Sequence, residues 1–222
     1  HIEISTKPEN HIGSDEIWDV ATDALRGALE HKGLDYQLNK GDGAFYGPKI
    51  DFHIKDSLER RWQCGTIQVD FSMPERFNLE YIGSDDNRHT PVMIHRAILG
   101  SVERFIGILI EHYGGSFPAW LAPVQCLVLP ISDKHIEYAE TIAEKLTQRS
   151  IRHEVDKRNE KVGYKIRSAE KRKIPYICVV GDREVEEETV SVRQHRKGDQ
   201  GALPVDTFLD NLVEIIKRRE NH

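Results

Sequence analysis

A glycine-rich segment at residues 41–49, Gly-Asp-Gly-Ala-Phe-Tyr-Gly-Pro-Lys, leads into a strand-like pattern. Its three glycines allow a positive φ or a close approach of the backbone to a ligand. Tyr46 offers a ring for stacking and Lys49 a cation for contact with an anion. The segment lacks the Gly-Lys-Ser/Thr ending of a P-loop, so a hairpin turn with an exposed lysine is the alternative interpretation.

A second candidate surface is the strand-like segment 63–71, whose two faces differ in polarity. Ile67, Val69 and Phe71 share one face, and the opposite face carries Thr66, Gln68 and Asp70. If another layer covers the polar face, it forms the floor of a polar pocket; otherwise it is the solvent-facing side of an antiparallel sheet. Gln63 has the parity of the apolar face, so it joins the pocket only through a bulge, which we place at Gly65.

Arg104 falls in the first turn of a helix that Gly100 and Ser101 open. A cation at this position opposes the helix dipole by a few tenths to about 1 kcal/mol. An anionic partner would explain why the cation is tolerated. An arginine in solvent, or one paired with Glu103, is the alternative.

His95 lies in a strand-like segment at residues 93–96. It is a metal ligand or an ordinary hydrogen-bonded histidine. No second His or Cys stands at zinc-finger spacing, so the residues alone favour the ordinary role.

The segment from Arg152 to Lys173 holds nine Lys and Arg against four Asp and Glu, although the whole chain carries a net charge of −6. A basic stripe of this kind meets phosphates or is a solvated helix face. Asn159 offers a donor and an acceptor to a base edge, while Arg158, Lys161, Lys165 and Arg167 can reach phosphates or stack. The sequence thus predicts either RNA contact, with Arg193 on the same face, or a capped and solvated helix.

The proline-containing segment 117–123 divides the chain into two parts with different successions of helices and strands. These elements position the candidate residues. Before this segment, helical spacing follows Ser14 and ends at Gly33, strands are expected at 49–55, 63–71 and 92–97, and a helix follows Ser101. After it, buried strands at 124–129 and 176–180 alternate with amphipathic helices at 133–149, 160–172 and 205–218, with a short strand at 151–155 and an edge strand at 190–193. We place the domains at residues 1–120 and 121–222.

Composition bounds the class of protein. Hydrophobic residues make up 38% of 222, enough for real cores, and no apolar run approaches the roughly 20 residues that span a bilayer. Cys64, Cys126 and Cys178 are too few and too scattered for a disulfide framework. We expect a cytoplasmic protein without membrane contact. Because a strand-like pattern follows His1 at once, we also expect a piece of a longer protein.

Four segments resemble, in order and spacing, the threonyl-tRNA synthetases of the bacterial type. They are Gly43–Lys49, Gln63–Phe71, Pro91–Phe105 and Asp156–Gly163. The resemblance covers essentially the whole chain and is to the C-terminal part of that family. It implies a partial antiparallel class II catalytic sheet with helices (α+β), followed by a compact α/β anticodon-binding domain with a mixed sheet.

The resemblance implies a threonine–tRNA ligase that activates threonine with ATP and Mg²⁺ and transfers it to the 3′ end of tRNA(Thr). Pro91–Phe105 is similar to the third class II motif, whose arginine, here Arg104, binds the ATP γ-phosphate. The residues implied as catalytic are Arg104, Lys49 and Gln63; those implied at ATP are Gln63, Thr66, Ser101 and Arg104; those implied at threonine are Tyr46, Gln68 and His95, with Lys49 nearby.

Further implications concern metal, RNA and assembly. His95 matches one of three zinc ligands, and a zinc ion that binds the threonine amino and hydroxyl groups would reject valine. Asn159, Glu184 and Arg193 match anticodon-reading positions, beside Arg158 and Lys161. The family also implies a homodimer. The other zinc ligands and the first two class II motifs have no counterpart here, so we expect this chain alone not to aminoacylate. The alternative is a non-catalytic RNA-binding module with a synthetase-like fold.

Overall fold

The computed structural model describes residues 1–221 and contains two compact units, His1–His112 and a second that begins at Tyr113. In the proline-containing segment, Ala119 belongs to the core of the second unit, and Ala122 is also buried. The domain junction placed between residues 120 and 121 stays a proposal. Within residues 1–221, no helix combines the length and the apolar character needed to cross a membrane.

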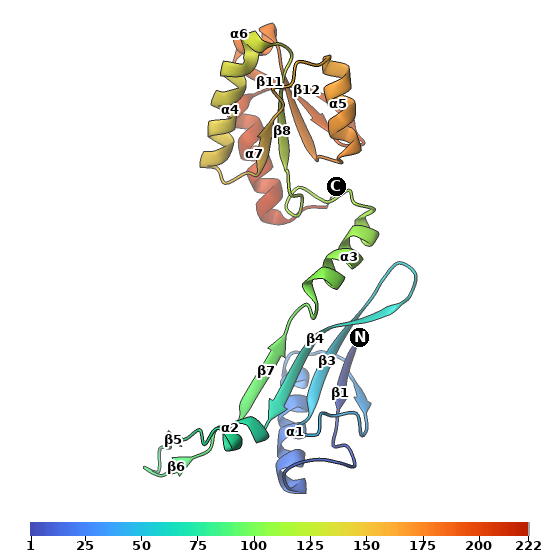
Figure 1. The fold of residues 1–222 in the computed structure, drawn as a ribbon, viewed down its shortest axis with the longest axis vertical. Coiled ribbons are helices and arrows are strands. Elements are labelled where there is room, and N and C mark those ends of the chain that lie inside the picture. The colour runs from blue at the N-terminus through green and yellow to red at the C-terminus, as the bar shows by residue number, and fades with distance from the viewer. Residues whose placement is uncertain (222) are drawn as a thin grey trace. The chain divides into compact units, whose positions relative to one another are not determined.

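The first unit is built on a five-stranded sheet in the order β2-β1-β3-β4-β7, antiparallel except where β1 pairs with β2 (Figure 1). The strands are β1 (Ile2–Ser5), β2 (Gln37–Asn39), β3 (Lys49–Lys55), β4 (Arg61–Asp70) and β7 (Met93–Ala97). The helices are α1 (Asp15–His31), α2 (Ser72–Arg76) and α3 (Val102–Tyr113), and a two-stranded ribbon joins β5 (Tyr81–Ile82) to β6 (Arg88–His89).

Helix α1 begins and ends where its sequence predicts. The Ser14 hydroxyl accepts a hydrogen bond from Ile17 N at 3.4 Å, and Gly33 takes φ +64° just after the helix. Leu25 and Leu29 on its buried face join a core with Ile50 and Val69 of the sheet, among other residues. The helix is therefore a scaffold that covers one face of the sheet.

The bulge expected beside Gly65 is confirmed. Phe52 pairs with Gly65 but His53 pairs with Gln63, so Cys64 is the extra residue in β4. A Cβ at Gly65 would lie 3.2 Å from the Phe52 ring, which leaves little room for any other residue. The bulge turns the Gln63 side chain to the polar face, as its contacts show below.

The second unit contains a five-stranded mixed sheet in the order β12-β11-β10-β8-β9. Its strands are β8 (Cys126–Pro130), β9 (His153–Val155), β10 (Tyr176–Val180), β11 (Thr189–Gln194) and β12 (Gly198–Pro204). Its helices are the 3-10 helix η1 (Asp133–His135), α4 (Ile136–Gln148), α5 (Val162–Lys171), α6 (Asp182–Glu187) and α7 (Val205–Arg218). Both β8 and β10 are buried throughout, as expected of central strands.

One sequence-based assignment in this unit is wrong. The segment 190–193 was expected as an edge strand, but β11 pairs with β10 on one side and β12 on the other. The segment that forms β12 contains Gly198, Asp199 and Gly201 and lacks apolar alternation. β12 follows β11 after a short turn, so the two segments lie close enough to pair. Backbone hydrogen bonds to β11 therefore form β12, although its sequence is not typical of a strand.

Two layers of helices cover this sheet on opposite faces (Figure 1). Helices α4 and α7 pack on the face that carries Val190 and Val192. Helix α5 packs on the other face, against Leu127 and Ile177 among others. Since side chains alternate along β11, Ser191 and Arg193 lie on the same face as α5.

The three cysteines are free and buried, as expected in the absence of a disulfide framework. In the second unit, the sulfur atoms of Cys126 and Cys178 lie 3.5 Å apart, and both residues are fully buried. Burial raises the pKa of Cys178 well above its ordinary value. The Cys178 thiol is therefore protonated, and both cysteine side chains pack as small apolar groups.

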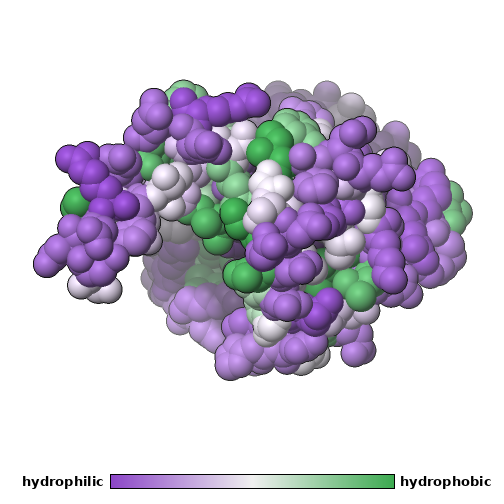
Figure 2. Space-filling model, turned by 90° about the horizontal axis from the view of Figure 1, so that it is seen from below, coloured by the Kyte–Doolittle hydropathy of each residue, from purple (hydrophilic) through white to green (hydrophobic). Residues whose placement is uncertain are grey.

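The first unit exposes an apolar surface along its sheet edge. Figure 2 shows the face that carries β5 and β6, with hydrophobic side chains between the hydrophilic ones. β7 is at the sheet edge, and exposed apolar side chains run through and around it: Phe77, Ile82, Ile94, Ile98, Ile106 and Ile110. An open edge beside exposed apolar side chains favours association.

The turn between β3 and β4 is held by a nearly buried carboxylate. Asp56, whose side chain is 4% exposed, accepts hydrogen bonds from Leu58 N, Arg60 N, Arg60 Nε and Trp62 Nε1. Burial alone would raise its pKa, but the Trp62, Arg60 and Leu58 donors lower it from 3.8 to about 2.

We predict that this pKa makes the first unit acid-sensitive between these two values. A lowered folded-state pKa stabilises the fold above the unfolded-state pKa of 3.8, and this stabilisation is lost as the pH falls towards about 2. Urea midpoints measured from about pH 5 to pH 2 should fall more steeply for the wild type than for Asp56→Asn. Parallel curves would contradict the prediction.

Candidate functional site

Three neighbouring strands bring the predicted residues of the first unit into rows. The register pairs Lys49 on β3 with Gln68 on β4, and Gln68 with His95 on β7. In the next row, Asp51 pairs with Thr66. Directly opposed residues of antiparallel strands project to the same face, so these polar side chains share one side of the sheet.

Tyr46 reaches this face from the glycine-rich loop. Its hydroxyl donates a hydrogen bond to Gln68 Oε1 at 2.8 Å, and burial followed by the charge of Asp70 raises its pKa. The loop lies against the backbone of β4, because a Cβ built at Gly47 would be only 1.7 Å from Val69 O. Glycine at this position is therefore required by the close approach of two backbones.

Asp51 links two of the predicted residues. It is 3% exposed, and its two carboxylate oxygens contact Gln63 Nε2 at 2.6 Å and Lys49 Nζ at 2.9 Å. Burial would lower the pKa of Lys49, but its interactions with Asp51 and Asp42 raise it, so the ammonium stays charged. One buried carboxylate thus fixes both side chains.

Asp70 plays the corresponding part for His95. Its Oδ2 lies 2.7 Å from His95 Nε2, while Oδ1 accepts hydrogen bonds from Ser72 N and Met73 N. Burial would raise the pKa of Asp70, but the donors from Met73, His95 and Ser72 lower it, so the group is a carboxylate. The histidine side chain is 37% exposed, and its Nδ1 is the ring atom left for a ligand.

These contacts bear on the zinc ion implied by resemblance. Within residues 1–221, no group of three or more His, Cys, Asp or Glu side chains is arranged to hold a metal. His95 can contribute one imidazole, held by a carboxylate in the way of many metal-binding histidines. The residues described here therefore do not form a zinc centre on their own.

Arg104 lies at the end of the polar face that Gln63 occupies. One guanidinium nitrogen donates to Gln63 O at 2.9 Å, and Arg104 N donates to Ser101 Oγ at 3.3 Å. Glu103 accepts a hydrogen bond from Ser101 Oγ, and the guanidinium is directed to β4. Thr66 Oγ1 is buried and has no hydrogen-bond partner within residues 1–221.

The sequence places Asp70 on the candidate polar face but does not link it to His95, and it gives no indication that Asp51 belongs to the site. Both alternate with apolar residues along their strands, a pattern that also fits a solvent-facing strand. What distinguishes them from exposed acids is a side-chain partner on a neighbouring strand, Gln63 for Asp51 and His95 for Asp70. Only the strand register shows that these partners meet.

In the second unit, the loop between β9 and α5 carries most of the predicted RNA contacts. Arg158 donates to both carboxylate oxygens of Asp156, at 2.9 and 2.7 Å, and its guanidinium carbon lies 6.0 Å from the Tyr164 ring centroid. The hydrogen bonds from Arg158 lower the pKa of Asp156 despite its burial. Asn159 and Lys161 follow in the chain and are exposed.

The other two predicted anticodon residues come from different elements. Glu184, on α6, accepts a hydrogen bond from Gly181 N at 2.9 Å. Arg193 contacts Asp199 at 3.2 Å, and its Nε is buried and without a partner within residues 1–221. The loop 156–161 and the start of α6 follow the carboxyl ends of the parallel strands β9 and β10, and Arg193 lies on the α5 face of the same sheet.

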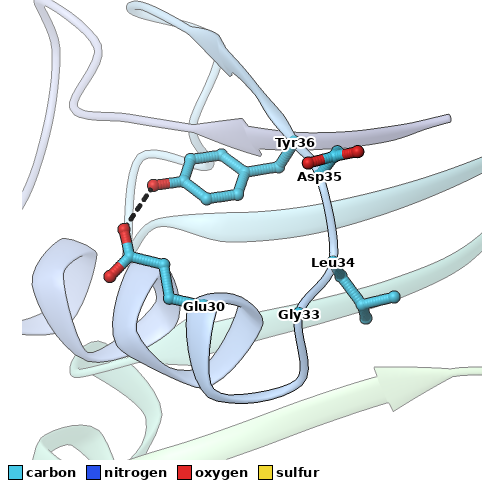
Figure 3. Close-up of a pocket in the computed structure, with 5 residues that line it drawn as sticks. All are labelled: Glu30, Gly33, Leu34, Asp35 and Tyr36. Atoms are coloured by element: carbon cyan, nitrogen blue, oxygen red, sulfur yellow. Dashed lines mark hydrogen bonds between the residues drawn. The ribbon is translucent and has the colours of Figure 1, made fainter.

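Two surface hollows differ in the residues that line them. A groove beside β9, lined by Glu154, Asp156, Arg158 and Arg172 among others, adjoins the predicted RNA loop. Another hollow lies at the end of α1, where Tyr36 donates to Glu30 at 3.0 Å (Figure 3). This second hollow contains none of the predicted site residues.

Comparison with known proteins identifies both units. Residues 4–113 match the model of the tRNA synthetase class II core domain (G, H, P, S and T), and residues 125–215 match that of the anticodon binding domain. A polar antiparallel sheet joined to such a domain defines a class II aminoacyl-tRNA synthetase, and the expected fold class is confirmed.

Individual relatives specify the family. The chain is 59% identical to the threonine–tRNA ligase of Desulforamulus reducens over 99% of its length, and 60% identical to that of Caldanaerobacter subterraneus over 97%. A crystal structure of the RNA binding domain of threonyl-tRNA synthetase from Cryptosporidium parvum matches 96% of this chain and 54% of that chain, with a TM-score of 0.86 and 40% identity. The chain belongs to the threonine–tRNA ligase family. It spans 34% of the length of both curated relatives.

The close contact at Gly47 generates a prediction about stability. Gly47→Ala should destabilise the first unit by about 2–3 kcal/mol, because the methyl group would overlap Val69 O and force the backbones apart. Gly27→Ala, in α1 with nothing within 4 Å of the added Cβ, should instead stabilise it by about 0.5–1 kcal/mol. Urea denaturation checks both, and equal effects would contradict the assignment.

Proposed function

We propose that this chain is the part of a threonine–tRNA ligase that binds the adenylate-forming substrates and reads the anticodon. The observation that supports this most directly is the row of Lys49, Gln68 and His95 across β3, β4 and β7. The row is bordered by Asp51 and Asp70, which keep its side chains in fixed directions. Fixed polar groups of this kind stabilise charge that develops during a reaction.

At the ATP end of this face, Arg104 receives the γ-phosphate. Its bond to Gln63 O orients the guanidinium, whose remaining N–H groups face no carboxylate that the structure describes, so they suit phosphate oxygens. Ser101 and Thr66 line the adenosine side, where Thr66 Oγ1 needs a partner. Mg²⁺ accompanies ATP as its counter-ion.

At the threonine end, Tyr46, Gln68 and His95 form the pocket. Because Tyr46 donates to Gln68 Oε1, the Gln68 amide nitrogen is left to donate to the substrate. Lys49 and Gln63 contribute positive charge and a donor near the bond that forms between carboxylate and α-phosphate. When bound, zinc would supply a Lewis acid for the threonine amino and hydroxyl groups; His95 would be this chain's one ligand to it.

The second unit reads tRNA(Thr) through Asn159, Glu184 and Arg193, supported by Arg158 and Lys161. The exposed amide of Asn159 offers a donor and an acceptor that are suited to an unstacked base. Membership of the family supports a homodimer and a cytoplasmic location as parts of the same proposal.

Adenylate formation tests the catalytic half. In the full-length Desulforamulus reducens ligase with its matching stretch replaced by this chain, we expect threonine-dependent pyrophosphate exchange. Arg104→Ala should reduce exchange by about 10²–10³-fold, because a charge that stabilises the transition state is lost. Arg26→Ala, on the surface of α1, is the matched control and should leave exchange unchanged.

The 222-residue chain should show no exchange by itself. Activity in the isolated chain would show that the missing length is dispensable. An inactive chimera that still binds tRNA would favour the non-catalytic RNA-binding module.

A separate prediction concerns anticodon reading. Asn159→Ala should weaken binding of the tRNA(Thr) anticodon stem-loop by about 1–3 kcal/mol, with a smaller loss for a stem-loop whose anticodon bases are replaced. The reason is that an amide reads base edges, which only the correct sequence presents in register. Fluorescence anisotropy with labelled RNA measures both. Equal losses for the two RNAs would contradict base reading.

A further inference from the structure

Lys165 is a buried charge next to the predicted RNA loop. It is 3% exposed, and its ammonium donates hydrogen bonds to Pro130 O at 3.1 Å and Asp156 O at 3.0 Å. A lysine has three donors and no acceptor, and its burial is costly unless its charge is compensated. Backbone carbonyls at the ends of β8 and β9 supply two acceptors, and the Asp156 carboxylate supplies a nearby negative charge.

These contacts connect Lys165 to the protein loop 156–161, which carries the predicted RNA contacts. Lys165 holds the backbone of Asp156, and the Asp156 carboxylate, 6% exposed, binds Arg158 through Nε, Nη2 and the backbone N–H. Arg158 lies beside Tyr164, on the same helix as Lys165. The loop is thus fastened at its first residue, at its third residue and at the helix that follows it.

The expectation that Lys165 reaches phosphates is wrong, because its side chain is buried. Because its ammonium is covered by protein, it cannot meet a phosphate unless α5 moves. An apolar side chain would remove the donor from the carbonyls of Pro130 and Asp156 at the point where two parallel strands separate. The ammonium thus connects the end of β8 to the first residue of the loop that follows β9.

We propose that Lys165 and Asp156 are positioning residues that hold the loop 156–161 in its RNA-binding conformation before RNA arrives. The inference rests on the proposed anticodon-reading function of this loop and adds residues that do not touch RNA. A loop ordered in advance loses less conformational entropy on binding, which strengthens binding and sharpens the discrimination between bases. Arg158 and Asn159 are the groups presented by this support.

The experiment compares the 222-residue chain with its variants Lys165→Met, Asp156→Asn and Lys161→Met. Lys165→Met keeps an unbranched side chain one atom shorter and removes the charge and the donors. Asp156→Asn leaves the backbone carbonyl that Lys165 binds but weakens the Arg158 contact. Lys161→Met removes an exposed cation from the same loop, and Lys217→Met, 68% exposed on α7, is the control for charge alone.

Three quantities are measured for each variant: affinity for the tRNA(Thr) anticodon stem-loop, the ratio to a stem-loop with replaced anticodon bases, and the slope of log affinity against log salt. Lys165→Met and Asp156→Asn should each lose affinity about tenfold, lose discrimination, and keep the wild-type slope. Lys161→Met should reduce the slope by about 0.7 and keep the discrimination, because it removes a phosphate contact. Lys217→Met should match the wild type.

Hydrogen exchange distinguishes a local loosening of the loop from a general loss of stability. In Lys165→Met and Asp156→Asn, the amides of Arg158 and Glu160 should exchange faster, while β8 and β10 stay protected. Folded variants with wild-type affinity and discrimination would overturn the proposal, and so would a reduced salt slope for Lys165→Met, which would make Lys165 a phosphate contact. If Lys165→Met fails to fold, Asp156→Asn decides by the same criteria.

A wild-type chain that does not bind the stem-loop would instead refute the proposed function.

Discussion

A charge taken out of water must be met by an opposite charge or by several hydrogen bonds, and both units of this chain are organised around that constraint. In the first unit Asp51 and Asp70 are each 3% exposed, and each is satisfied by side chains of the polar face. In the second unit Lys165 is satisfied by two strand ends. Because an unmet buried charge is so unfavourable, the satisfying groups have little freedom to move. Rigidity of the surrounding side chains follows from this.

The same requirement explains why backbone irregularities lie beside the sites. The bulge at Cys64 and Gly65 brings Gln63 to Asp51, and without it the amide would point to the apolar face. Gly47 lets the loop approach β4 closely enough for Tyr46 to reach Gln68. In each case a glycine takes up the distortion that the polar contacts need.

Periodicity predicted the long elements well, because α1, α7, β8 and β10 each bury a face or a whole strand and the sequence must show it. The strand β12 was missed, since Gly198 and Gly201 carry no burial signal and only the neighbouring β11 determines its pairing. The resemblance pointed to Lys49, Gln68 and His95 individually, but their common row depends on the register of three strands separated by loops. The sequence could not decide whether Asp51 and Asp70 are buried or exposed, because a buried acid and an exposed one have the same local pattern.

The distribution of cysteines has a consequence for following the two units separately. Cys64 is the free thiol of the first unit, and Cys126 and Cys178 are those of the second, all of them buried. A thiol sealed in a core reacts with a labelling reagent only when its surroundings open. Mass-resolved alkylation therefore records the opening of each unit through its own sulfur atoms, without any introduced probe.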